Sequence, residues 1–576
     1  MKSLNRPVLL FLLASAILMG CSETEESETK ASCNPTAVAS TRSAISSAEC
    51  IAIDLSSPAS ADSRVTVSEE SGVLTLTLKT TESLCLSLSG AYDGGVKIKN
   101  SNNVDVDLIL NSITITSDSH PGFLKLNTGN ELWGNTYLVQ LVGTSSITGA
   151  ASEDSKKALS AEPNLSFTGD GALNITARYK TGIGCDDVLT VYSGSISITV
   201  DRSAAAKTSG YEEKGFGIKA VNGFVMKGGS VSISANDSIT NYESRGIKVD
   251  GSDETACNTG KGYIHILDGS LTISADAKAL TAGWEADEDA TTSTTSDDPH
   301  PDIEISGGKL MLTTTGTPRE SSTNSLSPEG IEGKRHVTIS GGEIIVNATD
   351  DAIQAGNTLT IGGGKIFARA TSNDAIDSNG SILITGGQTI AFGASQPEAG
   401  LDADNNSNVN YTGGTLIAIG GDNNAPQGSA TTGSFVSTSL GTSSSGGMGG
   451  MGGPGGMGGS SALAGITLAL AADGSSDVIA AAKVPSDYVG GTSLLILSDA
   501  ITSGASYDVY QSPTLSPASL TWFNDALLLE SATLSGASPT SVTAGTASGG
   551  TGGGPGGGTP GGDGPGGGGP GGGPGH

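Results

Sequence analysis

The sequence predicts an all-β chain that folds as a right-handed parallel β-helix, a solenoid of stacked short strands, with a β-rich C-terminal cap and a disordered Gly/Pro tail. Glycine supplies 86 of the 576 residues and aromatic residues only 4%, a composition that favours strands and tight corners over helices. A phrase of alternating apolar residues around a glycine pair also recurs, and its later pairs begin at 307, 341, 363, 386 and 413. Repeats of this size, built from short strands, are typical of a solenoid.

The copies of this phrase indicate how each turn of the solenoid forms. They include VTISGGEIIV from Val337, LTIGGGKIFA from Leu359 and ILITGGQTIA from Ile382. Alternation places every second residue inside, and the glycines allow a corner that a Cβ atom would block. Equal positions of successive copies then lie above one another. We therefore expect one internal stack of four side chains, made by Ile331, Ile353, Ile376 and Leu401.

The N-terminus has the pattern of an export signal. Lys2 and Arg6 precede an apolar run that ends in Leu18-Met19-Gly20-Cys21. A run this short is typical of a signal peptide rather than a membrane span. Its last four residues resemble a bacterial lipobox, which implies cleavage before Cys21 and lipid attachment there. We expect a lipid-anchored protein of the cell envelope, at the outer membrane or cell surface. An ordinary signal peptide that contains a cysteine is the alternative.

Five further cysteines indicate no zinc site, because none belongs to a CxxC pair. They are Cys33, Cys50, Cys85, Cys185 and Cys257. An odd number cannot all pair within one chain. Outside the cytoplasm Cys33 and Cys50 could form a disulfide, and isolated buried thiols are an equally weighted alternative.

Acidic residues recur at fixed places beside the stacked apolar positions. Carboxylates that lie one above another repel unless a cation lies between them. Calcium accepts about six to eight oxygen ligands, which carboxylates and amides supply. We therefore predict a calcium site, and the expected ligands are Asp350, Asp351, Asp374, Asp377, Asp402 and Asp404.

A second interpretation of these acids needs no metal. Asp and Asn also suit tight corners, where their side chains cap the turn, and this explains single acids well. Earlier in the chain the same register is less acidic, since Lys219 and Lys248 follow the apolar position. A stacked set between residues 350 and 405 therefore favours a cation more strongly than Asp186 and Asp250 do.

Several of these phrases resemble a family of secreted carbohydrate-binding proteins. The phrases are GIKAVNG from Gly217, RGIKVDG from Arg245, DDAIQAGNTLTIGGG from Asp350 and NDAIDSNGSILITGG from Asn373, with the Gly/Met stretch near residue 450. The resemblance covers about Leu84 to Gly420. It implies a pectate-lyase-like right-handed β-helix, calcium sites and affinity for plant cell-wall polysaccharide. In the third copy Ala399 replaces the leading Asp of the family's phrase.

The predicted domains follow one another along the chain. They are a signal peptide (1–20), an acidic and polar tether (21–50), the β-helix (51–440), a Gly/Met-rich loop (441–461), a β-rich cap (462–545) and a disordered Gly/Pro tail (546–576). A cap is expected because an open solenoid end exposes strand edges and apolar interior. The tail is nearly all Gly and Pro and cannot bury apolar surface.

The formal net charge of −30 limits the partners. It argues against nucleic acid, because phosphate binding needs a basic surface. We predict a non-catalytic, surface-anchored lipoprotein that binds cellulose- or pectin-like polysaccharide through a calcium-stabilised fold. A calcium-dependent polysaccharide lyase or hydrolase and a β-helical adhesin or scaffold are the alternatives.

No catalytic residue is predicted. Lyase chemistry needs a base such as Arg or Lys beside the metal, and the nearby basic residues form no recognisable pair with the acids. Those considered are Arg245, Lys248, Lys334, Arg335 and Arg369. The residues that we expect to contact sugar are Trp284, Asn379 and Asn405.

Overall fold

The computed structural model describes residues 49–128, 135–203, 214–236, 243–251, 262–283, 302–319, 326–440, 463–523, 526–535 and 539–546. The predictions for Cys21, Trp284, Cys33, Cys257 and most of the tether, the Gly/Met-rich loop and the tail lie outside these residues. In the described part of the chain the only helical elements are 3-10 turns, among them η2 (Glu153–Ser155) and η4 (Asn406–Asn408). None of them has the length and apolar character that crossing a membrane requires.

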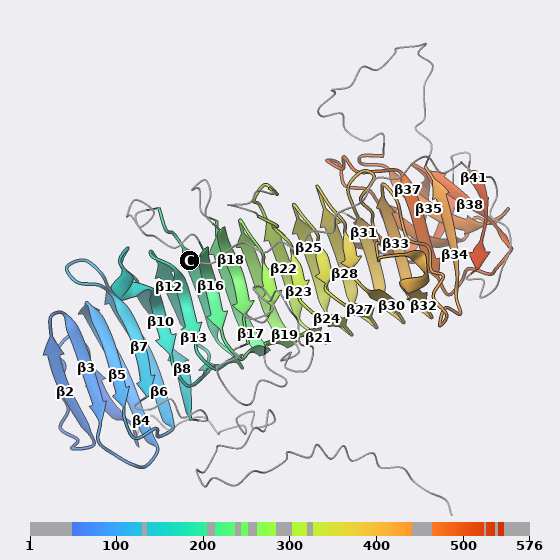
Figure 1. Ribbon diagram of the computed structural model, residues 1–576. Helices are drawn as coiled ribbons and strands as arrows, with labels where there is room; N and C mark the ends of the chain where they lie inside the picture. Colours follow the sequence, from blue (N-terminus) through green and yellow to red (C-terminus); the bar gives the residue numbers. More distant parts are fainter. Residues whose placement is uncertain are drawn as a thin grey trace, which may run out of the picture.

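One sheet of twelve strands, called sheet B here, runs along most of the elongated body (Figure 1). Its strands pair in parallel, apart from the antiparallel hairpin between the first two. They are β2 (Val65–Glu70), β3 (Val73–Leu78), β5 (Gly95–Asn100), β7 (Phe123–Thr128), β10 (Lys157–Ala161) and β13 (Thr181–Cys185). The sheet continues through β16 (Lys214–Ala220), β18 (Glu243–Val249), β20 (Leu280–Ala282), β23 (Ile331–Gly333), β26 (Ile353–Ala355) and β29 (Ile376–Ser378).

A larger sheet of 24 described strands, called sheet A here, forms the rest of the long body. Its first half contains β1 (Ile51–Asp54), β4 (Leu84–Asp93), β6 (Val106–Thr116), β8 (Thr136–Val142), β9 (Thr144–Thr148), β11 (Asn164–Gly169), β12 (Ala172–Ala177), β14 (Val188–Val191), β15 (Ser195–Val200), β17 (Gly223–Ala235) and β19 (Tyr263–Ala275). Its second half contains β21 (Asp302–Ile305), β22 (Lys309–Thr314), β24 (His336–Ile339), β25 (Glu343–Ala348), β27 (Thr358–Ile361), β28 (Lys365–Ala370), β30 (Ser381–Ile384), β31 (Gln388–Phe392), β32 (Val409–Tyr411), β33 (Thr415–Gly420), β34 (Ser434–Ser439), β37 (Ser493–Ser498) and β42 (Gly545–Thr546).

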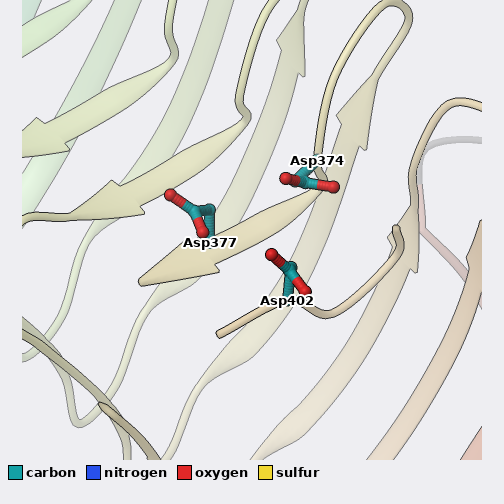
Figure 2. Close-up of side chains that lie close together, drawn as sticks. All are labelled: Asp374, Asp377 and Asp402. Carbon is teal, nitrogen blue, oxygen red and sulfur yellow. The ribbon is translucent and has the colours of Figure 1, made fainter. Parts of the chain in front are cut away.

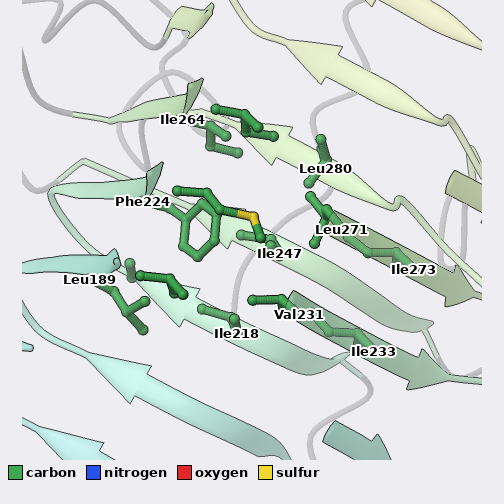
Figure 3. Packing of buried hydrophobic residues seen from close by; sticks show 14 of the residues in the cluster. Leu189, Ile218, Phe224, Val231, Ile233, Ile247, Ile264, Leu271, Ile273 and Leu280 are labelled. Atoms are coloured by element: carbon green, nitrogen blue, oxygen red, sulfur yellow. The ribbon is translucent and has the colours of Figure 1, made fainter. Parts of the chain in front are cut away.

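The core lies between the two sheets and is filled by alternate residues of the strands. In β26, Ile353 and Ala355 are fully buried while Gln354 between them is partly exposed. Figure 3 shows side chains of sheet A, such as Phe224 and Ile264, in the same buried cluster as Ile247 and Leu280 of sheet B. Burying one such apolar side chain stabilises the fold by about 1.5–3 kcal/mol. The alternation therefore fixes which face of every strand points inward.

Successive repeats stack in register, as the sequence predicts for the apolar positions. Ile331 pairs with Ile353, and Ile353 with Ile376. Leu401 continues the row: the backbone N–H of Asp402 donates to the carbonyl of Ile376 at 2.8 Å, and the Leu401 side chain is fully buried.

The all-β class is confirmed, but the prediction of an open right-handed parallel β-helix is wrong. Parallel pairings close on themselves in the first half of the body, so that the chain contains a closed eight-stranded parallel ring plus further sheets. The ring runs β6–β8–β11–β14–β17–β15–β12–β9 and returns to β6.

Two long strands cause this closure. β6 has 11 residues and β17 has 13, and each continues through the place where the repeat predicts a corner. In β17 the ladder shifts register around Lys227 instead of ending, and Gly229 takes up the strain with φ +74°. Each long strand thus pairs with two series of strands that the sequence predicts as separate.

Antiparallel strands follow the last parallel strand. β37 pairs with β33 and β34. A four-stranded sheet contains β35 (Thr467–Ala472), β36 (Val478–Lys483), β38 (Ser506–Gln511) and β41 (Thr540–Thr543), and a hairpin contains β39 (Thr514–Phe523) and β40 (Ala526–Ser535). These strands cover part of the segment predicted as a cap, whose boundaries stay a prediction.

The N-terminal cysteines pair differently from the suggested Cys33–Cys50 bridge. Cys50 forms a disulfide with Cys85, and their Cα atoms lie 4.5 Å apart. The bond joins the segment before β1 to β4, the strand with which β1 pairs. Cys185 is a free, fully buried thiol, and burial raises its pKa.

Candidate metal centre

Three of the six predicted metal ligands converge at one end of sheet B. Asp374, Asp377 and Asp402 each offer a carboxylate oxygen, and these oxygens all lie within 4.8 Å of one another. Figure 2 shows the three side chains together, with Asp377 on β29 and Asp402 on the segment that follows β31. Their row continues an outward column of the sheet, because Asp377 pairs with Gln354 and Gln354 with Glu332.

The backbone of the next turn explains why Asp351 and Asp374 lie where they do. The N–H of Asp374 donates to a carboxylate oxygen of Asp351 at 2.9 Å. In the same way the N–H of Ala399 donates to Asp374. Both aspartates therefore cap a corner of the following turn, which is the role that the metal-free interpretation predicts. That interpretation explains Asp351 well, and Asp374 in part.

Asp377 and Asp402 are placed by strand pairing rather than by capping. Asp377 is the outward residue between two buried neighbours on β29. Asp402 is held beside that strand because the N–H of Ser378 donates to the Asp402 carbonyl at 3.3 Å. Both side chains are partly exposed, so their carboxylates face one another and the solvent.

Burial and mutual repulsion shift the titration of these carboxyl groups. Burial first, and then nearby carboxylates such as Asp402, raise the pKa values of Asp374 and Asp377 to about 7, against hydrogen bonds that lower them. The pKa of Asp402 is also raised, mainly by burial. Burial and four surrounding acids raise the pKa of Asp351 well above its usual value. Near pH 7 the carboxyl groups of Asp374 and Asp377 are therefore partly protonated unless a cation lies beside them.

The remaining predicted site residues do not belong to the group of three converging carboxylates. Asp350 accepts a hydrogen bond from the Asn373 amide at 2.9 Å. Asp404, Asn379 and Asn405 are exposed, and the Asn405 side chain caps η4 by accepting from the Ser407 N–H at 3.0 Å.

Sequence reasoning missed one acid, Glu398. Burial, followed by Asp402 and Asp350, raises the pKa of its carboxyl group, which places it in the electrostatic field of the centre. It stands one residue before Ala399, where the third copy of the repeat lacks its leading Asp. The sequence could have identified Glu398, because it is an acid one position before the place where the repeat expects its leading Asp.

The preceding turns of the same columns carry their own cations. Lys278 forms ion pairs with Glu329 at 3.0 Å and with Glu332 at 2.6 Å, and Lys334 contacts Glu332 at 2.7 Å. Lys278 was also missed. It stands two places before Leu280, the same place that Glu329 and Asp351 occupy relative to their stacked isoleucines.

The earlier acids of this register are neutralised in a similar way. Asp186 accepts from Lys157 at 2.5 Å. Asp250 contacts Lys219 at 2.6 Å and Lys248 at 2.9 Å. These two acids therefore already have cationic partners.

The candidate bases are engaged elsewhere. Arg245 pairs with Glu243 at 3.1 Å, and Arg369 pairs with Asp487 at 3.0 Å. Arg335 also has interaction partners.

A depression of about 460 Å³ lies elsewhere on the body, at the corners between strands of sheet A. Residues 140–144 and 169–172 and Ser195 line it, and Asp170 is its one carboxylate. With so few polar groups directed into it, the depression offers less specific chemistry than the aspartate centre.

Gln354→Lys tests the charge imbalance without a metal. A lysine between Glu332 and Asp377 in the same column should raise the melting temperature of metal-free protein at pH 8 by about 1 °C, because opposite charges across a strand pair contribute up to about 1 kcal/mol. Thermal unfolding in chelator measures this. Thr360→Lys, on β27 of sheet A, adds the same charge away from the acids. Equal gains in both variants would mean that only the net charge matters.

Comparisons with known proteins give two matches. A family model described as "Carbohydrate-binding domain-containing protein" matches residues 70–375, more than half of the chain. The solved structure of a polysaccharide lyase-like protein from C. thermocellum, a gadolinium derivative, is similar over 58% of this chain and 95% of its own, with 14% sequence identity and a TM-score of 0.32. No curated protein matches the chain.

Proposed function

Because this chain belongs to the family of carbohydrate-binding domain-containing proteins, we propose that it binds an acidic polysaccharide of the plant cell-wall type through a calcium ion. The observation that carries the proposal is the convergence of Asp374, Asp377 and Asp402 within 4.8 Å. In the described part of the chain none of these three carboxylates forms an ion pair. Two turns earlier, lysines neutralise Glu329 and Glu332, whereas among the described residues the three carboxylates of this centre have no such partner.

The oxygen ligands suit calcium better than a transition metal. The centre offers carboxylates and neither His nor Cys, and calcium prefers such oxygen ligands at about 2.3–2.6 Å. Bound calcium supplies a positive charge that draws a sugar carboxylate to an otherwise acidic surface. Asp377 and Asp402 would hold the ion from the solvent side, and Asp374 from the corner that it caps.

The ligand would be a uronate-bearing chain, as in pectin. Its carboxylate completes the coordination shell of the ion, and exposed Asn379 and Asn405 lie near enough in sequence to the centre to hydrogen-bond sugar hydroxyls. Trp284 remains a proposed contact on sequence grounds alone. A cellulose-like neutral chain has no carboxylate and would bind without calcium.

We propose that the protein is a non-catalytic binder. The basic residues near the centre are held in ion pairs, such as Lys334 with Glu332 and Arg369 with Asp487, and a paired cation is a poor general base. A calcium-dependent lyase or hydrolase is the main alternative, and an adhesin or scaffold that binds no sugar is the other.

The anchoring of the protein is also a proposal. It is supported by the lipobox at Leu18 to Cys21, which would attach the chain by lipid at the outer membrane or cell surface. A polysaccharide-binding surface in that place would hold the cell to its substrate.

Binding to polygalacturonate should depend on calcium and on the acids of the centre. The full chain should bind in 1 mM calcium, and chelator or Asp377→Asn with Asp402→Asn should weaken binding at least tenfold, because both remove the bridging cation. Asp170→Asn, away from the centre, serves as the control. Affinity electrophoresis measures binding. Calcium-independent binding that survives the double substitution would reject the site, and unsaturated products absorbing in the ultraviolet would establish a lyase.

A further inference from the structure

Lysines gather on the outward column of sheet B at the end opposite to the aspartate centre. Lys97 of β5 and Lys125 of β7 lie directly opposite each other in register, and the same column continues through Ser160 and Gly184 to Lys219 of β16. Lys97 and Lys125 are partly exposed and form no ion pair among the described residues. Like charges directly opposite each other cost stability, so the repulsion does not favour the pairing of these two strands.

The surrounding residues extend this pair into a positive surface. We define the lysine surface as Lys97, Lys125, Lys157, Lys180 and Lys219. Lys157 forms an ion pair with Asp186, and Lys219 shares Asp250 with Lys248. Lys180 is surrounded by further cations: burial first, and then Lys156, Lys219, Arg202 and Lys214, lower its pKa to about 8. The surface is thus basic although the whole chain has a net charge of −30.

Two glycines allow neighbouring side chains to lie along this surface. A Cβ on Gly184 would lie 2.4 Å from the Lys157 side chain, which instead lies across the glycine. The Phe123 ring covers Gly95 in the same way, and the Lys125 ammonium lies 4.3 Å from the centre of that ring. Side chains that lie along the sheet leave an open path for an extended polymer, whereas upright ones would block it.

The lysine surface and the aspartate centre lie on one line. One outward column of sheet B contains Lys97, Lys125, Lys219 and Asp377. Nine residue pairings between neighbouring strands lead along it from Lys97 to Asp377. At about 4.8 Å per pairing the separation is about 43 Å. An extended polymer with regularly spaced negative groups can contact both ends at once.

We propose that the lysine surface binds carboxylate groups of a uronate polysaccharide directly, without a metal ion, as a second contact beside the calcium centre. This inference rests on the proposed function, because the ligand is the same acidic polysaccharide. Ammonium groups in register attract carboxylates, and the flat sheet positions several of them along one chain. Two contacts far apart on one polymer raise the overall affinity by raising the effective concentration at the second.

Polygalacturonate binding by the full chain in chelator and low salt tests the proposal. We expect weak binding that 0.3 M salt abolishes, since exposed charges are screened. Lys97→Gln with Lys125→Gln should weaken this binding about fivefold to tenfold. Lys97→Arg with Lys125→Arg, which keeps both charges, should retain it. Lys309→Gln with Lys365→Gln on sheet A changes the net charge equally and should leave binding intact. Circular dichroism checks that each variant folds.

The outcomes separate this proposal from the function on which it rests. Calcium-dependent binding with none in chelator would leave the proposed function standing and overturn the lysine surface. Equal weakening by the sheet A control would also overturn it, because only net charge would then matter. Dextran sulfate binding that competes with polygalacturonate and is lost in the Gln variant would support the surface. No binding to polygalacturonate under either condition would reject both.

Discussion

Calcium should raise the melting temperature of the full chain by about 2–3 °C at pH 8, and by much less at pH 5. An ion present at one hundred times its dissociation constant stabilises the fold that binds it by about 2.7 kcal/mol, and each kcal/mol is about 1 °C for a chain as long as this one. Thermal unfolding with calcium and with chelator measures the difference. Unchanged melting at pH 8 would mean that the aspartates are only corner formers.

The pH dependence follows from the raised pKa values. Asp374 and Asp377 have pKa values of about 7 in the fold and about 4 when unfolded. The folded state therefore holds their protons more tightly, so the metal-free protein loses stability as pH rises from about 4 to about 7. Calcium removes this penalty at pH 8. At pH 5 it must displace protons, and its stabilising effect becomes smaller.

Asp377→Asn separates the metal from a structural role because the two predict opposite signs. Without calcium the variant should melt at a higher temperature than the wild type at pH 8, since one repelling charge has been removed. Adding calcium should raise the melting temperature of this variant only slightly. A variant that melts lower under both conditions would show that the Asp377 carboxylate is needed by the fold itself. Asp170→Asn should behave as the wild type under both.

The stacked positions could be predicted because a fixed inward place in each repeat requires an apolar side chain. Ile353 and Ile376 therefore pair as expected, and acids at fixed offsets from them, such as Asp374 and Asp377, meet as well. The ring closure could not be predicted, because β6 and β17 keep extended backbone through residues that form corners in other copies.

The contacts that sequence reasoning missed depend on which turn becomes the neighbour of which. Lys278 precedes Glu329 by a long insertion, and only strand pairing of β20 with β23 brings them together. The Cys50–Cys85 bond likewise depends on the pairing of β1 with β4. A local repeat pattern carries no information about such neighbours once insertions vary in length.

Lys278→Met should lower the free energy of unfolding by about 3–5 kcal/mol at pH 8, the usual cost of removing one partner from a buried ion pair. Lys278 is largely buried, with 12% of its side chain exposed, and it neutralises both Glu329 and Glu332. Those two carboxylates lower the cost of burying its charge and raise its pKa. Methionine fills much of the same volume, so the loss reports the charge rather than a cavity. Urea unfolding measures it.

The size of this loss should itself depend on pH, which distinguishes charge from packing. Without Lys278 the folded-state pKa values of Glu329 and Glu332 rise, so the variant loses further stability relative to the wild type as pH increases from 5 to 8. Leu280→Ala, on the same strand segment, should cost about 2–5 kcal/mol at either pH, because a cavity carries no titrating group. If the free energy of unfolding lost in Lys278→Met is also the same at pH 5 and pH 8, the lysine acts through packing. The internal cation would then be no model for the calcium ion proposed three turns later.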